Sequence, residues 1–156
     1  MTKQSADIES ILERLDEIKA MPKPEHTREA RALSVEQLSH AEAILQAWVL
    51  AHDGVPTNER KEGFRLLALH RQGAKGIPSF NACRESCREI VFQHNVVAAS
   101  DQEAEQESAL RLMTMVVRHL ALFVSGKLQV AGLGEFCCAS KPLRQSSEII
   151  SAPQNL

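Results

Sequence analysis

Two of the four cysteines and one of the six histidines lie in the stretch SFNACRESCREIVFQH, residues 79–94. Cys83 and Cys87 are four residues apart, and side chains at this spacing are neighbours on a helix, so both thiolates could contact one metal ion. His94 lies about 10 Å beyond Cys87 along such a helix, which is too far for zinc bonds of about 2.0–2.3 Å. The helix alone therefore supplies at most two ligands.

Completing a thiolate site would require Cys137 or Cys138, which are adjacent in the sequence. Adjacent side chains point in different directions in both helices and strands, so both can bind one ion only at a special turn. Free cysteine is also among the most buried residue types. We therefore expect Cys83 and Cys87 to be core residues. A thiolate metal or redox sensor that uses Cys83, Cys87 and one of Cys137 and Cys138 is kept as an alternative hypothesis.

Other chemical motifs are missing from the sequence. None of the six histidines has a glutamate three residues before it, as the Glu-x-x-His motif of di-iron bundles requires. The sequence also contains no P-loop, zincin motif, nucleophile elbow or dinucleotide fingerprint. We expect a protein without enzymatic activity, with no catalytic residue and no cofactor.

The composition indicates one soluble helical domain. The chain has 156 residues, of which 44% are hydrophobic and only 4% aromatic. An aliphatic, alanine-containing core favours helices over β-sandwiches. The formal net charge of −2 gives no overall attraction to nucleic acid or to an anionic membrane. The first residues lack the apolar segment of a secretory signal, and the apolar stretch 110–124 is interrupted by charges, so we expect a cytoplasmic protein.

The N-terminal residues 1–21 are predicted to form an amphipathic helix. Ile8, Ile11, Leu15 and Ile18 are spaced three, four and three residues apart, which places them on one face. This face is expected to dock onto the body of the protein or onto a second subunit. The prolines that follow predict a linker at residues 22–33.

Four further helices are expected, at about residues 34–53, 57–73, 79–99 and 100–126. Ser34 with Gln37, and Ser100 with Glu103, have the spacing of capping boxes. Gly126 is expected to end the last helix. The predicted fold is therefore all-α: a compact bundle of four to five helices at residues 34–139, with a short irregular or hairpin segment near residues 128–139 and a mobile tail at residues 140–156.

The last predicted helix is apolar on most sides. Eleven of the fifteen residues from Leu110 to Val124 are apolar, and Arg111, Thr114 and Arg118 form one narrow polar stripe. A helix of this kind is either central in a bundle or contacts a partner with one face. We therefore expect a helical interaction protein, a small regulator of bacterial type, that binds a protein partner or forms a homodimer without contacting a membrane. The residues predicted to bind the partner are Leu110, Met113, Val117, Leu120, Val124, Ile8, Ile11 and Leu15.

A DNA-binding regulator is a further alternative. Between Arg60 and His94 the chain has seven Lys or Arg residues and three Glu residues, on two predicted helices. The loop GAKGIPS between them is longer than the turn of about 3–4 residues in a helix-turn-helix. Glu85 and Glu89 also accompany Arg84 and Arg88, which is typical of a solvated face. Nucleic-acid binding is therefore not the preferred function.

Overall fold

The computed structural model describes residues 3–75 and 83–129, with side chains from residue 7 onward. Within these residues the chain forms six α-helices and, apart from one isolated antiparallel bridge between Lys61 and Phe64, no β-structure. The predicted all-α bundle is confirmed. The first two residues of the segment predicted to be irregular, 128 and 129, belong to the last helix. The rest of that segment and the predicted tail lie outside the described residues. The helices are α1 (Lys3–Ala20), α2 (Lys23–Arg28), α3 (Ala30–Ala51), α4 (Arg65–Ala74), α5 (Arg84–Ala99) and α6 (Glu103–Gln129).

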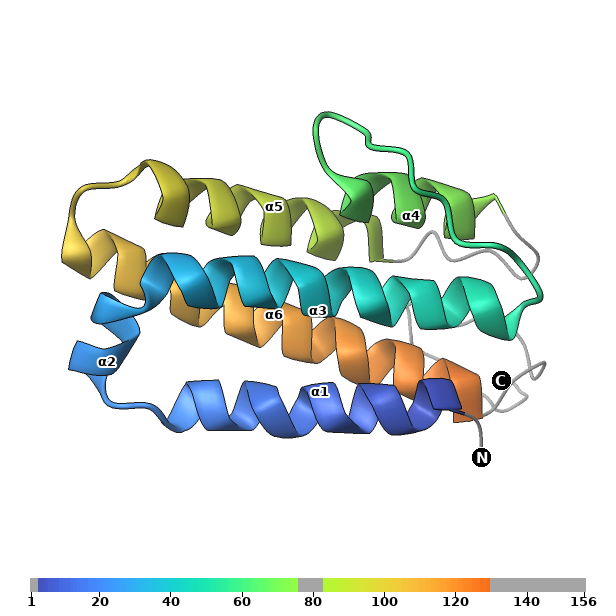
Figure 1. The fold of residues 1–156 in the computed structure, drawn as a ribbon, viewed down its shortest axis with the longest axis horizontal. Helices are drawn as coiled ribbons and strands as arrows, with labels where there is room; N and C mark the ends of the chain where they lie inside the picture. Colours follow the sequence, from blue (N-terminus) through green and yellow to red (C-terminus); the bar gives the residue numbers. More distant parts are fainter. Residues whose placement is uncertain (1–2, 76–82, 130–156) are drawn as a thin grey trace, which may run out of the picture.

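Helices α3 and α6 form the centre of the bundle (Figure 1). Helix α6 packs against α5, α3, α1 and α2, and α3 packs in addition against α4. In Figure 1 α1 runs along one side of this pair, and α4 and α5 lie on the other side. The main core cluster is mostly aliphatic, as the composition predicts, and among its buried members in the described part of the chain only Trp48 is aromatic.

The apolar face of α1 docks onto the body of the protein. Ile8, Ile11, Leu15 and Ile18 are each no more than 7% exposed. Helix α1 contacts α6 and α3. Of the two docking modes expected for this face, the structure shows the one within the chain.

The segment predicted as a linker is largely helical. Helix α2 begins directly after Pro22 with Pro24 in its first turn, where a missing backbone N–H costs nothing. Helix α3 begins at Ala30, so Ser34 is not an N-cap and this prediction is wrong. Ser34 is instead buried, and its hydroxyl shares a 2.7 Å hydrogen bond with Nδ1 of His94 in α5.

Other predicted boundaries also shift. Helix α4 begins at Arg65 rather than near residue 57, because residues 52–64 form a loop with positive φ angles at Asp53, Glu62 and Gly63. Helix α6 continues past Gly126 to Gln129, since a solvent-exposed glycine weakens a helix without ending it.

The turn between α5 and α6 is organised by Ser100, without the predicted capping box. The Ser100 hydroxyl accepts the N–H of Gln102 at 3.0 Å and donates to the carboxylate of Glu105 at 2.5 Å, so Glu103 is not its partner. The Gln106 side chain donates to the Ser100 carbonyl, and so does Arg31 from the start of α3. This end of the bundle is therefore held by polar contacts between α3 and the α5–α6 turn.

Candidate interaction surface on helix α6

The eight side chains predicted to bind a partner lie in the chain's own core. Each is no more than 7% exposed: five lie on the apolar face of α6 that α1, α3 and α5 cover, and three lie on the face of α1 that packs against the bundle. The expectation that they form an interface is therefore not supported by their position. They are Leu110, Met113, Val117, Leu120, Val124, Ile8, Ile11 and Leu15.

The opposite face of α6 also carries large apolar side chains. Leu112, Met115 and Leu122 are 42%, 63% and 48% exposed, and His119 between them is exposed. These four residues are spaced three, four and three apart, so they form one stripe along the helix. We call this stripe the outer face of α6. Val116 and Phe123, which are partly buried, adjoin it.

The sequence contained the signal for this outer face but not its position. A helix that is apolar on most sides has two candidate core faces, and periodicity alone does not say which of them the bundle covers. Once α1, α3 and α5 are placed against α6, the apolar residues of α6 that stay exposed are those of the outer face.

A pocket of about 370 Å³ lies where α1 and α2 meet α6. Ligand pockets in proteins are typically about 300–1,000 Å³ in volume. Its lining combines apolar side chains with cations and contains no carboxylate. The lining residues are Lys19, His26, Arg111, Thr114, Met115, Arg118, His119 and Leu122. The pocket is thus continuous with the outer face through Met115, His119 and Leu122.

Both arginines of the pocket are anchored through Nε. Arg111 donates from Nε to the nearly buried carboxylate of Glu107, and Arg118 donates from Nε to Asp16 of α1 at 3.0 Å. Among the described residues, no hydrogen bond engages the Nη nitrogens of either guanidinium. Each arginine is therefore oriented by the chain while its outer N–H groups stay available to a second carboxylate or a phosphate.

His26 fixes the wall of the pocket formed by α2. The imidazole is 2% exposed and its Nε2 donates to the carbonyl of Ile18 near the end of α1. Its Nδ1 lies 3.7 Å from the Glu107 carboxylate in α6. The side chain therefore hydrogen-bonds α2 to α1, while its Nδ1 faces α6 without a hydrogen-bond partner among the described residues.

The described cysteines lie in the core. Cys83 and Cys87 are both 0% exposed, and burial raises the pKa of the Cys87 thiol to about 12. Cys137 and Cys138 lie outside the described residues, and within residues 3–75 and 83–129 no group of three potential ligands could hold a metal ion. A thiol with so high a pKa is almost entirely protonated at neutral pH and is a poor ligand and nucleophile.

His94 lies near the cysteines on α5 but makes different contacts. It bonds to Ser34, and its ring packs edge-on against Phe64 with centroids 5.8 Å apart. Desolvation lowers the pKa of this imidazole, so it is neutral at pH 7.

Several cations of the candidate DNA-binding segment are engaged by carboxylates. Arg65 lies 3.7 Å from Glu42, and Arg71 lies 3.6 Å from Glu59. Arg88 pairs with Glu62 at 3.0 Å. A surface whose arginines are already paired attracts phosphates weakly.

Comparison with protein families, with characterised proteins and with solved structures gave no match. Within the described residues, α6 is long and apolar enough to cross a membrane by length and composition. In its most apolar 18-residue window 44% of the helix is buried in the bundle, and a core helix of a soluble protein meets the same criteria of length and composition.

Proposed function

We propose that the protein is a non-enzymatic, cytoplasmic helical module that binds a protein through the outer face of α6. The observation that carries this proposal is the exposure of Leu112, Met115 and Leu122 at helical spacing. Isolated exposed apolar residues are ordinary, but three of them aligned along one face of a helix form a continuous apolar stripe, and such stripes mark interaction sites.

The position of the outer face suits an interface. The underlying helix is the most extensively packed element of the bundle, so it is a rigid platform that loses little entropy on binding. The pocket beside it supplies a concave region that an inserted side chain could fill, as the anchors of protein interfaces do. The bound protein is either a different chain or a second copy of this one.

Neither alternative function gains support from the described residues. The buried Cys83 and Cys87 are poorly placed to sense metals or oxidants. The paired arginines around α4 and α5 are poorly placed to bind DNA. Both alternatives would need features outside the described part of the chain.

Selection of helical peptides from a display library against the purified protein would test the proposal. The selected peptides should bind the wild type, and binding should be lost in a Met115→Glu, Leu122→Glu double variant. Phe92→Glu is the matched control, because Phe92 is 60% exposed but lies on α5. Thermal unfolding would establish that all three proteins are equally folded. Peptides that bind the double variant as well as they bind the wild type would count against the outer face.

A further inference from the structure

The lysine and arginines that line the pocket are not accompanied there by any lining carboxylate. From Ser108 to Gln129 helix α6 contains no aspartate or glutamate, and its Arg111 and Arg118 line the pocket. Lys19 at the end of α1 adds a further cation to the pocket. Because the chain as a whole has a formal charge of −2, this basic and apolar region is a local feature.

From these charges we propose that the occupant of the outer face is an acidic amphipathic helix of a protein partner. Its apolar residues would pack on Met115 and Leu122, and its carboxylates would bind Lys19 and the Nη groups of Arg111 and Arg118. This inference rests on the proposed function and adds the chemistry of the partner.

The chain itself contains an example of this packing. Helix α1 lies against α6 with its apolar residues inward, and its Asp16 carboxylate binds Nε of Arg118. The exposed side of α1 is rich in carboxylates, namely Asp7, Glu9, Glu13, Asp16 and Glu17. A partner helix of the same character would approach Arg118 from the pocket side, where its Nη groups are available.

The same charges argue against the two other occupants. A second copy placed with α6 facing α6 would bring the pocket cations of both copies together. The carboxylates beside these cations, Glu107 and Asp16, are already bonded to Arg111 and Arg118 of their own copy. An anionic membrane is a broad surface and would also meet the exposed carboxylates of α1 beside the outer face. A helix is narrow enough to follow the outer face and avoid them.

Fluorescence polarisation with two synthetic helical peptides tests the inference. Both peptides carry leucines at heptad positions a and d, and the flanking positions are glutamates in one and lysines in the other. The glutamate peptide should bind about ten-fold more tightly than the lysine peptide at low salt, because several rim charges contribute a few tenths of a kcal/mol each. Lys19→Glu and Arg111→Gln should each lower the affinity for the glutamate peptide about three-fold or more. Arg84→Glu, an exposed arginine on α5 with no ion pair among the described residues, should leave its affinity unchanged.

The outcomes separate this inference from the proposed function. Equal binding of both peptides, lost in Met115→Glu, would overturn the acidic partner and retain the interaction surface. Sedimentation of a dimer that Met115→Glu dissociates would identify a second copy as the occupant and also overturn the acidic partner. If the protein binds phosphatidylserine vesicles in preference to the glutamate peptide, the occupant is an anionic membrane and the acidic partner is overturned. Absence of binding to both peptides, to vesicles and to a second copy would overturn inference and proposed function together.

Discussion

Arg118 of α6 donates a hydrogen bond from Nε to the Asp16 carboxylate of α1 at 3.0 Å, across 102 residues of sequence. Both side chains are largely solvent-exposed, at 41% and 59%. A pair of this kind adds little to stability, so its main effect is to orient the guanidinium at the edge of the pocket.

Asp16→Asn should therefore separate orientation from stability. We expect the free energy of unfolding to change by less than about 1 kcal/mol, because the pair is exposed. The affinity for the glutamate peptide should change, since a neutral amide oxygen holds the Arg118 guanidinium less firmly than the carboxylate does. Urea unfolding and fluorescence polarisation on the same preparations measure both quantities. A loss of several kcal/mol would instead show that the pair is structural.

Val117→Asp should destabilise the fold strongly and Met115→Asp hardly at all, although the two residues are only two positions apart on α6. Val117 is 0% exposed and Met115 is 63% exposed. Burying an unpaired carboxylate should cost about 3 kcal/mol or more, whereas the exposed substitution should stay within about 0.5 kcal/mol. Circular dichroism on heating would compare them. Equal melting temperatures would contradict the assignment of inner and outer faces.

Gln37→Met should stabilise the protein. The Gln37 side chain is 0% exposed, and neither its amide nitrogen nor its amide oxygen has a hydrogen-bond partner among the described residues. Removing an unsatisfied buried polar group while keeping the volume should raise the free energy of unfolding by about 1–3 kcal/mol. Gln37→Glu has nearly the same shape but introduces a charge, and it should destabilise. If Gln37→Met lowers the free energy of unfolding, the amide has a partner that the described residues do not include.

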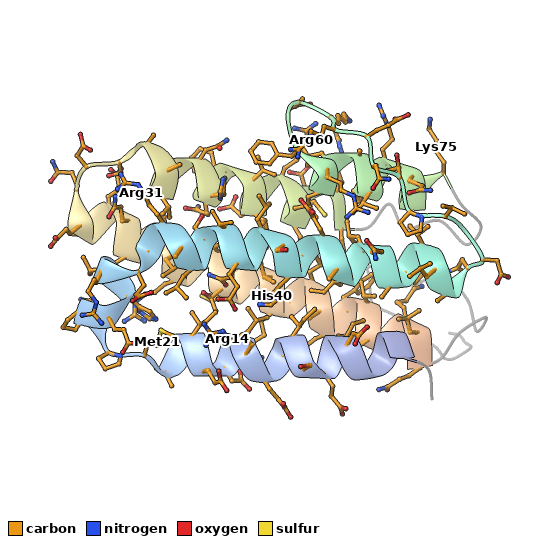
Figure 2. The ribbon with its side chains drawn as sticks, viewed as in Figure 1. Arg14, Met21, Arg31, His40, Arg60 and Lys75 are labelled. Atoms are coloured by element: carbon orange, nitrogen blue, oxygen red, sulfur yellow. The ribbon has the colours of Figure 1, made fainter. Side chains whose placement is uncertain are left out.

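Glu36 should make stability depend on acid pH. It accepts two hydrogen bonds from Arg14, at 2.7 and 3.0 Å, and it shares a third of 2.9 Å with His40. Figure 2 shows Arg14 and His40 in the region between α1 and α3. Hydrogen bonding to Arg14 lowers the pKa of Glu36 below its usual 4.5. The carboxylate therefore contributes stability above about pH 4.5, and this contribution is lost as the pH falls further. Glu36→Gln should remove about 1 kcal/mol at pH 7 and less at pH 3, as measured by urea unfolding at both pH values.

Cys87 should be unreactive in the folded protein. Its pKa of about 12 leaves it protonated at pH 8, where an ordinary thiol is partly ionised. Because this pKa is raised on folding, the associated stability is complete below about pH 9 and is lost as the pH rises toward 12. In a Cys137→Ser, Cys138→Ser variant, a thiol reagent should label Cys83 and Cys87 only at the rate of unfolding. Rapid labelling under native conditions would revive the redox hypothesis.

The sequence predicts the helical class of this fold better than its surfaces. The spacing of Ile8, Ile11, Leu15 and Ile18 identified the buried face of α1 because a helix with one apolar stripe has only one way to bury it. Helix α6 has apolar residues on both sides, so its buried face could not be assigned before its neighbours were placed. The start of α3 was predicted at the wrong residue because Ser34 and Gln37 have the residue types and spacing of a capping box. In the structure both residues lie within α3 and are buried by tertiary packing.

The route of the chain also sets the order in which the molecule can form. Helix α1 precedes α6 in the chain, and its Asp16 contacts α6 across 102 residues, so its apolar face has no complete binding site until α6 has been synthesised. During translation this face is exposed and open to chaperones or to misassociation. The pocket, which needs α1, α2 and α6 together, is therefore among the last features to appear. An unfinished chain would not display the surface that we propose binds the partner.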